Sequence, residues 1–243
     1  MITKKKYKDI KSLKDKKIRY AQKKFTVEGI RLLQTILDEN IPIECAVYTR
    51  EFYSKHLEFI KQINDKILFE ISEKEMKDLS NAITPSGILA ITNFPIYSNL
   101  DLSKNLIYLD QISDPGNMGT ILRTASWFGI DQVALSNNCI DPFNPKVIAA
   151  AMGSHFLLKF IGKEKIENLD EHLWIGASLN GKKLPKVKEF KRKWVLAMGS
   201  EAHGISEKTM ERLDEIYTIP KLGKGESLNV AVAMGIFLDI LVS

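Results

Sequence analysis

The C-terminal third of the chain contains Gly199-Ser-Glu-Ala-His-Gly204, followed by Ile219-Pro-Lys-Leu-Gly-Lys-Gly-Glu-Ser-Leu-Asn-Val-Ala-Val-Ala233. Each stretch follows a short apolar run, and the second leads into a long apolar helix. A third stretch of the same character lies upstream and reads Asp114-Pro-Gly-Asn-Met-Gly-Thr-Ile-Leu-Arg123. Glycines placed this densely predict backbone that bends sharply or approaches a ligand closely.

The part of the chain around these stretches is predicted to be an α/β domain with a parallel sheet covered on both faces. Its strands read as near-continuous apolar runs separated by helical patterns, which is typical of such sheets. The expected strands are 106–109, 132–135, 173–177, 194–198 and 216–219, and the expected helices are 120–128, 145–151, 206–213 and 228–241.

The residues before this domain are predicted to form a second, smaller α/β unit that ends near residue 94. Ser72-Glu-Lys-Glu75 fits a capping box, in which the serine and glutamate side chains satisfy backbone groups at a helix start. The other expected elements are helices over 26–39 and 53–63 and strands over 43–48, 67–71 and 88–92.

The positive charge of the chain is concentrated at its N-terminus. Residues 1–24 hold eleven Lys and Arg against two Asp, although the whole chain has a formal net charge of only +5. Such a segment suits phosphate neutralisation on a polyanion, and the alternative is a solvated tail. We therefore expect a basic N-terminal arm over 1–24, a small domain over 25–94, a polar linker over 95–105 and a larger domain over 106–243.

Composition excludes several classes of protein. No run approaches the eighteen apolar residues that a membrane-spanning helix needs, and the first residues lack the apolar core of a signal peptide. Cys45 and Cys139 are too few for a disulfide framework, and no paired metal-ligand spacing occurs. We expect a cytoplasmic protein without a metal and without a membrane partner.

The upstream stretch places Asn117, Gly119 and Arg123 where a strand passes through a Pro-Gly loop into a helix. Open α/β sheets bind ligands at this position. An exposed helix arginine and an ordinary N-cap at Ser227 are the simpler readings of two of the motif residues. However, the three stretches occur together and in order, and they resemble the three signature motifs of the SpoU (TrmH) family of RNA ribose 2′-O-methyltransferases.

The first unit carries a looser resemblance of the same kind. Phe25-Thr-Val-Glu-Gly-Ile-Arg31 and Thr84-Pro-Ser-Gly-Ile-Leu-Ala90 resemble the start and the end of the substrate-binding domain that precedes many SpoU catalytic domains. That domain is similar to a small RNA-binding ribosomal protein. The resemblance therefore implies an RNA substrate-binding domain over 25–94 and a methyltransferase domain over 106–243.

The resemblance also implies a cofactor, a topology and a site. Family members use S-adenosylmethionine, fold the catalytic region into a trefoil knot and form homodimers with the active site at the interface. By motif position, the residues expected to contact S-adenosylmethionine are Gly199, Ile219 and Leu228. Those expected to form the catalytic site are Asn117, Arg123, Glu201, Ser227 and Asn229.

The predicted function is methyl transfer to a ribose 2′-hydroxyl of RNA, with ribosomal RNA favoured because a separate N-terminal domain is present. Three alternatives stay open: a transfer RNA substrate, methylation of a different RNA atom, and a non-catalytic ribosome-associated RNA-binding factor on the same fold. The joint presence of all five catalytic candidates favours an enzyme over a binding factor.

Overall fold

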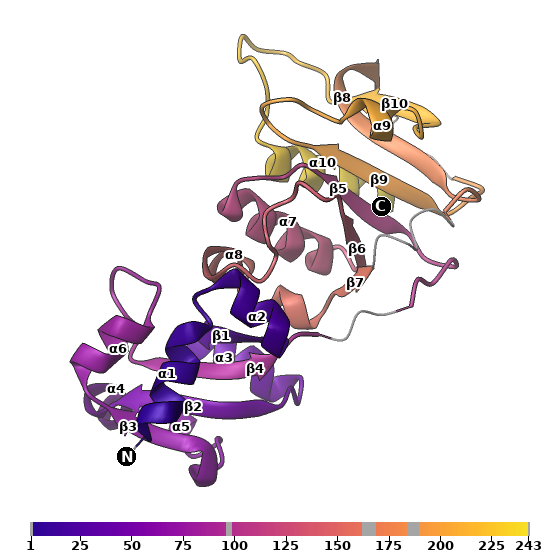
Figure 1. Ribbon diagram of the computed structural model, residues 1–243. Helices are drawn as coiled ribbons and strands as arrows, with labels where there is room; N and C mark the ends of the chain where they lie inside the picture. The colour runs from indigo at the N-terminus through magenta and orange to yellow at the C-terminus, as the bar shows by residue number, and fades with distance from the viewer. Residues whose placement is uncertain (1, 96–98, 162–168, 184–189, 243) are drawn as a thin grey trace. The chain divides into compact units, whose positions relative to one another are not determined.

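A computed structural model of the protein describes residues 2–95, 99–161, 169–183 and 190–242 (Figure 1). The chain forms two compact units. The first comprises Met1–Phe94 together with Phe143–Phe156, and the second comprises Pro95–Pro142 and Leu157–Ser243. Residues 96–98 of the expected linker lie outside the described residues.

The first unit is built on a four-stranded mixed sheet in the order β1-β4-β2-β3. Strand β4 pairs antiparallel with β1 and with β2, whereas β2 and β3 are parallel. The capping box at Ser72 and Glu75 is present and opens α6, as predicted. The strands are β1 (Lys24–Glu28), β2 (Ile43–Thr49), β3 (Leu68–Ile71) and β4 (Ile88–Asn93), and the helices between them are α3 (Ile30–Asp38), α4 (Arg50–Lys55), α5 (Leu57–Ile60) and α6 (Glu73–Leu79).

The helix predicted over 26–39 is wrong in its first turn. Residues 24–28 form strand β1, and the helix begins only at Ile30. The change of structure occurs at Gly29, whose φ of 98° lies in the left-handed region that L side chains rarely adopt. The Gly29 amide donates to the Ile88 carbonyl, which fixes the end of β1 against β4. Sheet pairing therefore outweighs the helical spacing of the apolar residues.

The expected basic arm is also corrected by the structure. Residues 4–12 form helix α1 (Lys4–Ser12) and residues 16–22 form helix α2 (Lys16–Gln22). Ile10 and Leu13 are almost fully buried in a core cluster with residues of β2, β4 and α6. Two buried side chains suffice to hold a short amphipathic helix on the sheet, because burying each contributes about 1.5–3 kcal/mol. The segment is thus an integral part of the first unit.

The segment Phe143–Phe156 belongs to the first unit although it lies between two strands of the second. It contains helix α8 (Pro145–Ala151), which the sequence predicts, and a short 3-10 turn. The Phe143 ring is fully buried and stacks on Phe94 with centroids 3.9 Å apart, while Phe25 lies 5.3 Å away. The first unit thus takes in residues 143–156, which lie within the expected larger domain 106–243.

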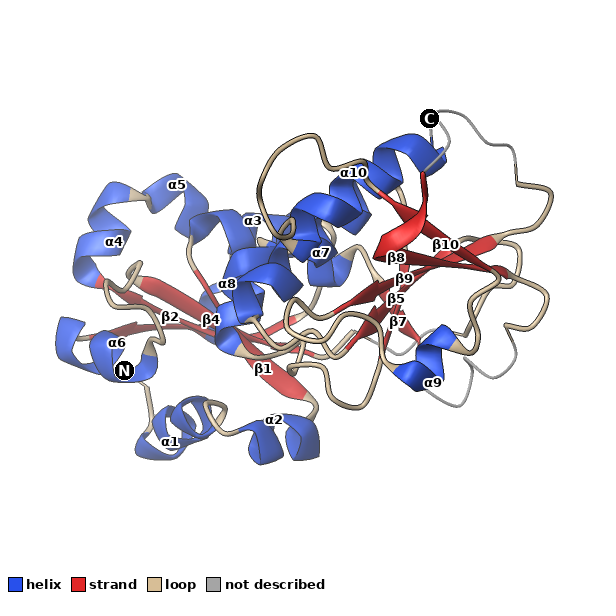
Figure 2. Cartoon of the chain, turned by 90° about the horizontal axis from the view of Figure 1, so that it is seen from above, coloured by secondary structure: helices blue, strands red, loops and turns tan. Residues whose placement is uncertain are grey.

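The second unit contains a six-stranded sheet in the order β10-β8-β9-β5-β6-β7, and all of its strands are parallel. The predicted parallel sheet is confirmed. Helices α7 and α10 pack against each other on one face, and α9 lies on the other (Figure 2). The elements are β5 (Leu106–Asp110), α7 (Pro115–Trp127), β6 (Gln132–Leu135), β7 (Lys159–Ile161), β8 (Leu173–Lys183), β9 (Trp194–Gly199), α9 (Glu207–Met210), β10 (Glu215–Thr218) and α10 (Val230–Val242).

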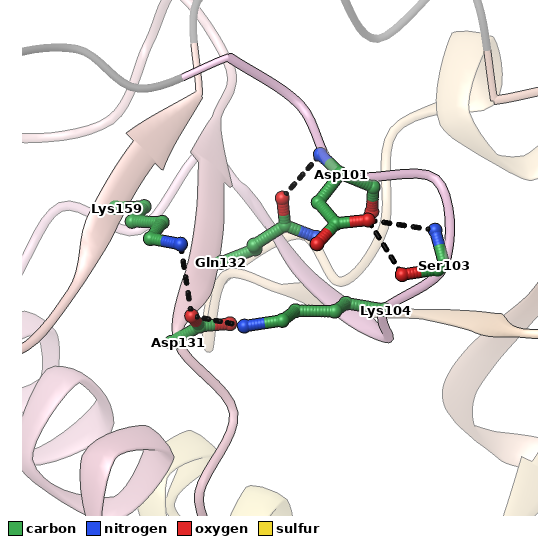
Figure 3. Close-up of polar contacts among 6 residues, drawn as sticks. All are labelled: Asp101, Ser103, Lys104, Asp131, Gln132 and Lys159. Carbon is green, nitrogen blue, oxygen red and sulfur yellow. Dashed lines mark hydrogen bonds and ion pairs between the residues drawn. The ribbon is translucent and has the colours of Figure 1, made fainter.

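The end of the linker is fastened to the second unit (Figure 3). The fully buried Gln132 amide accepts a hydrogen bond from the Asp101 backbone N–H at 2.8 Å and donates to its carbonyl at 3.1 Å. Asp131 forms ion pairs with Lys104 at 2.8 Å and with Lys159 at 3.4 Å. The chain thus enters β5 from a fixed position. The trefoil knot that the resemblance implies stays a prediction.

Candidate active site

The turn after β9 is the tightest part of the site. Ser200 and Gly204 exchange two backbone hydrogen bonds, with N–O distances of 3.0 and 2.8 Å, and so close a small loop. A Cβ on Gly199 would lie 2.1 Å from the Gly204 carbonyl carbon, and Gly204 itself has a φ of +69°. Both glycines are therefore required by backbone geometry. The loop places Glu201 and its neighbours beyond the carboxyl end of the sheet.

The pairing of strand β8 with β10 is interrupted next to this loop. Gly176 pairs with Ile216 and Lys182 pairs with Tyr217, so residues 177–181 have no partners on the facing strand. Gly181 sits directly on the β10 backbone, because a Cβ there would approach the Tyr217 carbonyl carbon to 2.5 Å. The hydroxyl of Thr218 donates to the Leu179 carbonyl at 3.3 Å. Residues 177–180, which lie in this interruption of the pairing, line a cavity.

The third wall is the loop from Ile219 to Asn229 that leads into α10. Gly223 and Gly225 have open space where a Cβ would stand, and residues 221–229 are exposed. Leu222 is 99% exposed and Leu228 is 49% exposed. Apolar side chains held in the open at the rim of a cavity are suited to covering a ligand.

A cavity of about 660 Å³ lies among these three loops. This volume is within the range of small-molecule sites, about 300–1,000 Å³. Its wall combines apolar side chains such as Met198, Ile205 and Phe237 with backbone groups of the glycine loops. This mixture of surfaces suits a small ligand that has both apolar and hydrogen-bonding parts. The cavity is lined by all three expected cofactor residues, Gly199, Ile219 and Leu228, and by two of the catalytic candidates, Glu201 and Ser227.

Three of the expected catalytic residues are joined by hydrogen bonds. The Asn117 amide Nδ2 donates to Glu201 Oε1, and the Asn229 Nδ2 donates to Asn117 Oδ1 at 2.8 Å. Asn229 Oδ1 accepts from the Ala231 backbone N–H at 3.0 Å, so this residue also caps α10. Because the cap fixes the Asn229 amide, its Nδ2 must point to Asn117. Loops that lie 84 and 112 residues from Asn117 thereby meet at one point.

Asn117 is oriented from its own side as well. The Asp114 carboxylate accepts from the Asn117 backbone N–H at 2.7 Å and caps α7, with Pro115 at the first helical position. The Asp-Pro pair that precedes the motif is thus a helix start, and its local role is to hold Asn117 at the carboxyl end of β5.

Arg123 is not part of this network. Its side chain is exposed on α7, and it forms no hydrogen bond or ion pair with another described residue. It lies six positions after Asn117, so the two side chains leave the helix in directions about 120° apart. Trp127, one turn further, is 86% exposed. The chain by itself does not bring Arg123 to Asn117 and Glu201.

Asp110 contributes to the geometry of the site and is not among the residues predicted from the sequence. It is 2% exposed at the end of β5, and its Oδ2 accepts from the Ser206 backbone N–H at 2.8 Å and from the Ser206 hydroxyl at 2.7 Å. A serine at the start of a helix is usually a cap, but the Ser206 side chain makes no cap hydrogen bond. Asp110 instead anchors the exit of the 199–204 loop. A lone acidic residue ending an apolar strand is the signal that could have found it.

Burial controls the ionisation of two neighbouring groups. It raises the pKa of the Tyr108 phenol on β5 and of the Cys139 thiol, which donates to the Leu109 carbonyl at 3.2 Å. Both groups therefore stay protonated and add no negative charge to this edge.

Within the described ranges, no cluster of three or more metal-ligating side chains occurs. None of the helices there is long and apolar enough to cross a bilayer.

Comparison with known proteins agrees with this geometry. The profile of the SpoU rRNA methylase family matches residues 104–239, which include every loop of the cavity. The chain belongs to the SpoU rRNA methylase family. An MRM3-like substrate-binding domain matches residues 4–90, a span that includes α1 and α2. The SpoU domain and its N-terminal companion thus account for nearly the whole chain.

Individual relatives extend over the full length. The 23S rRNA (guanosine(2553)-2′-O)-methyltransferase RlmP of Bacillus subtilis is 30% identical and covers 96% of this chain and 94% of its own. A solved TrmH-family protein from Porphyromonas gingivalis is 30% identical with a TM-score of 0.83, covering 98% and 97% of the two chains. An S-adenosylmethionine-bound rRNA methyltransferase from Sinorhizobium meliloti is 27% identical, covers 98% and 94%, and has a TM-score of 0.80.

Proposed function

We propose that this SpoU enzyme transfers the methyl group of S-adenosylmethionine to a ribose 2′-hydroxyl of ribosomal RNA. The observation that carries the proposal is the cavity at the carboxyl ends of β8, β9 and β10 with the Asn117–Glu201–Asn229 network beside it. The naming of RlmP and of the Sinorhizobium protein as rRNA methyltransferases supports the choice of RNA.

The cofactor supplies a methyl group already activated on a sulfonium. The protein therefore has to bind the cofactor and the RNA, orient the ribose 2′-hydroxyl towards the methyl group and remove the hydroxyl proton. We assign cofactor contacts to Gly199, Ile219 and Leu228, because all three line the cavity. Gly199 and Gly204 bring backbone into close approach, and the exposed Leu228 covers the apolar part of the ligand.

The ribose hydroxyl is a poor nucleophile and must be placed in line with the methyl group. We assign this placement to Asn117, Ser227 and Glu201. Asn117 is held between Glu201 and Asn229, and its orientation is therefore set before substrate arrives. We assign Arg123 to the developing alkoxide or to an adjacent substrate phosphate, because a guanidinium stays charged and acts as an electrostatic partner.

We further propose that the site is completed in a homodimer. Arg123 is exposed and lies apart from the network of its own chain, and the exposed Trp127 lies on the same helix. A second copy that covers this part of α7 would receive Arg123 in its own site. The two free thiols, Cys45 and Cys139, favour a reducing compartment, and we propose the cytoplasm.

A mixing experiment tests the shared site. Arg123→Ala and Asn117→Ala variants are each expected to be inactive alone. If the two residues act across an interface, co-refolded mixtures should recover about one quarter of wild-type activity, since half of the dimers are mixed and each has one intact site. No recovery in mixtures shown to contain mixed dimers would place Arg123 in its own chain's site.

The reaction itself is tested with purified protein, S-adenosylmethionine and ribosomal RNA. Mass mapping should locate one added methyl group on a ribose, and alkaline hydrolysis should spare the bond that follows it. Methylation confined to transfer RNA, or a methyl group on a base, would contradict the proposal. Binding of RNA without any methyl transfer would favour the non-catalytic alternative.

A further inference from the structure

The first unit carries a group of exposed lysines that form no ion pair or side-chain hydrogen bond with a described residue, although Lys16 Nζ lies over the Tyr20 ring at 5.7 Å. We define the α1–α2 lysine face by the side chains that are exposed and that form no ion pair or hydrogen bond with another described residue. They are Lys4, Lys5, Lys8, Lys16 and Lys17.

Other basic residues of this segment are occupied by interactions that hold the helix in place. Lys11 pairs with Asp78 at 2.7 Å, and the Tyr7 hydroxyl donates to the same carboxylate at 2.6 Å. Lys14 donates to the Asp78 and Ser80 carbonyls at 2.8 Å, at the end of α6. The lysines thus divide into a set that fastens the helix and a set that faces solvent.

Helix geometry explains the division. Ile10 points into the core cluster, and at about 100° per residue Lys4, Lys5 and Lys8 leave the helix about 120–160° away from it. Lys4, Lys5 and Lys8 are therefore neighbouring charges held by a packed helix, and Lys16 and Lys17 stand in the first turn of the next helix. A solvated arm, in contrast, would hold its charges at no fixed spacing.

This arrangement is unfavourable for the isolated protein. Lys4 and Lys8 are like charges at i,i+4, and the first turn of α1 holds three lysines and no acid, although the helix dipole favours negative charge there. None of the described carboxylates forms an ion pair with the face. A polyanion would remove the repulsion. Residues 25–243 hold 24 Lys and Arg against 28 Asp and Glu, so the surplus of positive charge lies in the first 24 residues.

From this charge pattern we infer that the α1–α2 lysine face binds phosphates of the RNA substrate. The inference rests on the proposed function for the identity of the polyanion. Phosphate contacts position RNA and add affinity but carry no base information, so the face fixes how the substrate lies on the first unit. Selection of the modified nucleotide stays with other contacts.

The test uses the full-length protein with Lys4, Lys5 and Lys8 changed to Gln. The control changes Lys55, Lys61 and Lys66 to Gln and removes equal charge; these are exposed lysines of the same unit, of which the first two pair with Glu51 and Glu58. RNA binding is measured by fluorescence anisotropy between about 50 and 200 mM salt. The slope of log affinity against log salt should become shallower by about 0.7 for each single-strand phosphate that the protein no longer neutralises, and only in the first variant.

A second pair of changes, Lys16→Gln with Lys17→Gln, should reduce the slope further. Affinity for S-adenosylmethionine, measured by calorimetry, should not change in any variant. Equal slopes for wild type, face variant and control would overturn the inference. The inference would also be overturned if the face variant bound RNA as the wild type does but bound ribosomal proteins more weakly. Because anisotropy reports binding alone, these outcomes are separate from a failure of the methyl-transfer assay, which would reject the proposed function instead.

Discussion

The two sheets of this protein use parallel and antiparallel pairing to different ends. In the second unit all six strands run the same way, so their loops gather at one edge, where Asn117, Glu201 and Asn229 meet. In the first unit β4 runs against both neighbours, and no single edge collects the loops. Chemistry can thus be located in the second unit from strand direction alone. In the first, the informative feature is charge that the packing leaves exposed.

The strongest way to break this comparison is to remove the piece of the first unit that the second half of the chain supplies. Phe143→Ala should lower the free energy of unfolding of the first unit by about 3–5 kcal/mol, because it removes a fully buried aromatic ring. Hydrogen exchange should quicken in β1 and β4 and stay slow in β5 and β9. Ile121→Ala, in the core of the second unit, should give the reverse pattern. Faster exchange in β5 alone after Phe143→Ala would contradict the assignment.

The second prediction concerns the chemistry that we assign to the second unit. Arg123→Ala should lower the rate of methyl transfer by about 10²–10³, because one preorganised charge is removed from the transition state. Affinity for S-adenosylmethionine should stay within a few-fold, since Arg123 is assigned to the hydroxyl. Single-turnover kinetics and calorimetry in excess chelator measure the two effects. Near-normal turnover would remove Arg123 from the mechanism, and failure of the cofactor to bind in chelator would reject a metal-free site.

The third prediction separates a loop that needs glycine from a helix that tolerates alanine. Gly199→Ala forces the Gly204 backbone to move and should weaken S-adenosylmethionine binding by tenfold or more, about 1.4 kcal/mol. Gly235→Ala in α10 meets only an ordinary contact with Thr124 at 3.8 Å and should bind normally. Calorimetry on both variants measures their affinities for S-adenosylmethionine. Equal affinities would mean that the 199–204 turn does not shape the cofactor site.

The smallest effect is expected where α1 joins the first unit. Burial and then the hydrogen bond to Asp78 raise the pKa of Tyr7 to about 12. A neutral phenol is thus favoured in the folded state, and its contribution is present below about pH 10 and disappears as the pH rises towards 12. Tyr7→Phe should lower the free energy of unfolding by about 0.5–1.5 kcal/mol at neutral pH. Urea unfolding should show the difference from wild type shrinking above about pH 10, and a constant difference would contradict this account.

Sequence patterns predict the second unit better than the first. Buried parallel strands leave apolar runs in the sequence. Such runs predict β5, β6, β8, β9 and β10. Strand β7 has three residues and no pattern to detect. In the first unit, the apolar spacing around Thr26 suits a helix as well as a strand, and only pairing with β4 decides between them. Charge density conceals the two buried residues that make α1 part of the core.

The sequence selects candidate site residues but does not show how their side chains are connected. Motif order identifies Asn117, Glu201 and Asn229, yet their hydrogen bonds depend on how three distant loops meet. Arg123 stays a prediction as a catalytic group, because nothing in the single chain brings it to the others. A lone acidic residue at the end of an apolar strand draws attention to Asp110, but its partner Ser206 lies 96 residues away and local patterns do not reveal the pair.

The segment Phe143–Phe156 has a consequence for how the protein is made. A domain at the start of a chain ordinarily folds as soon as it leaves the ribosome. Here the core around Phe25 and Phe94 stays open until Phe143 has been synthesised, a delay of roughly 2–10 s at ordinary translation rates. During that interval the nascent chain exposes aromatic surface while the first strands of the second sheet emerge. A chaperone at the tunnel exit would meet this protein with both units unfinished at once.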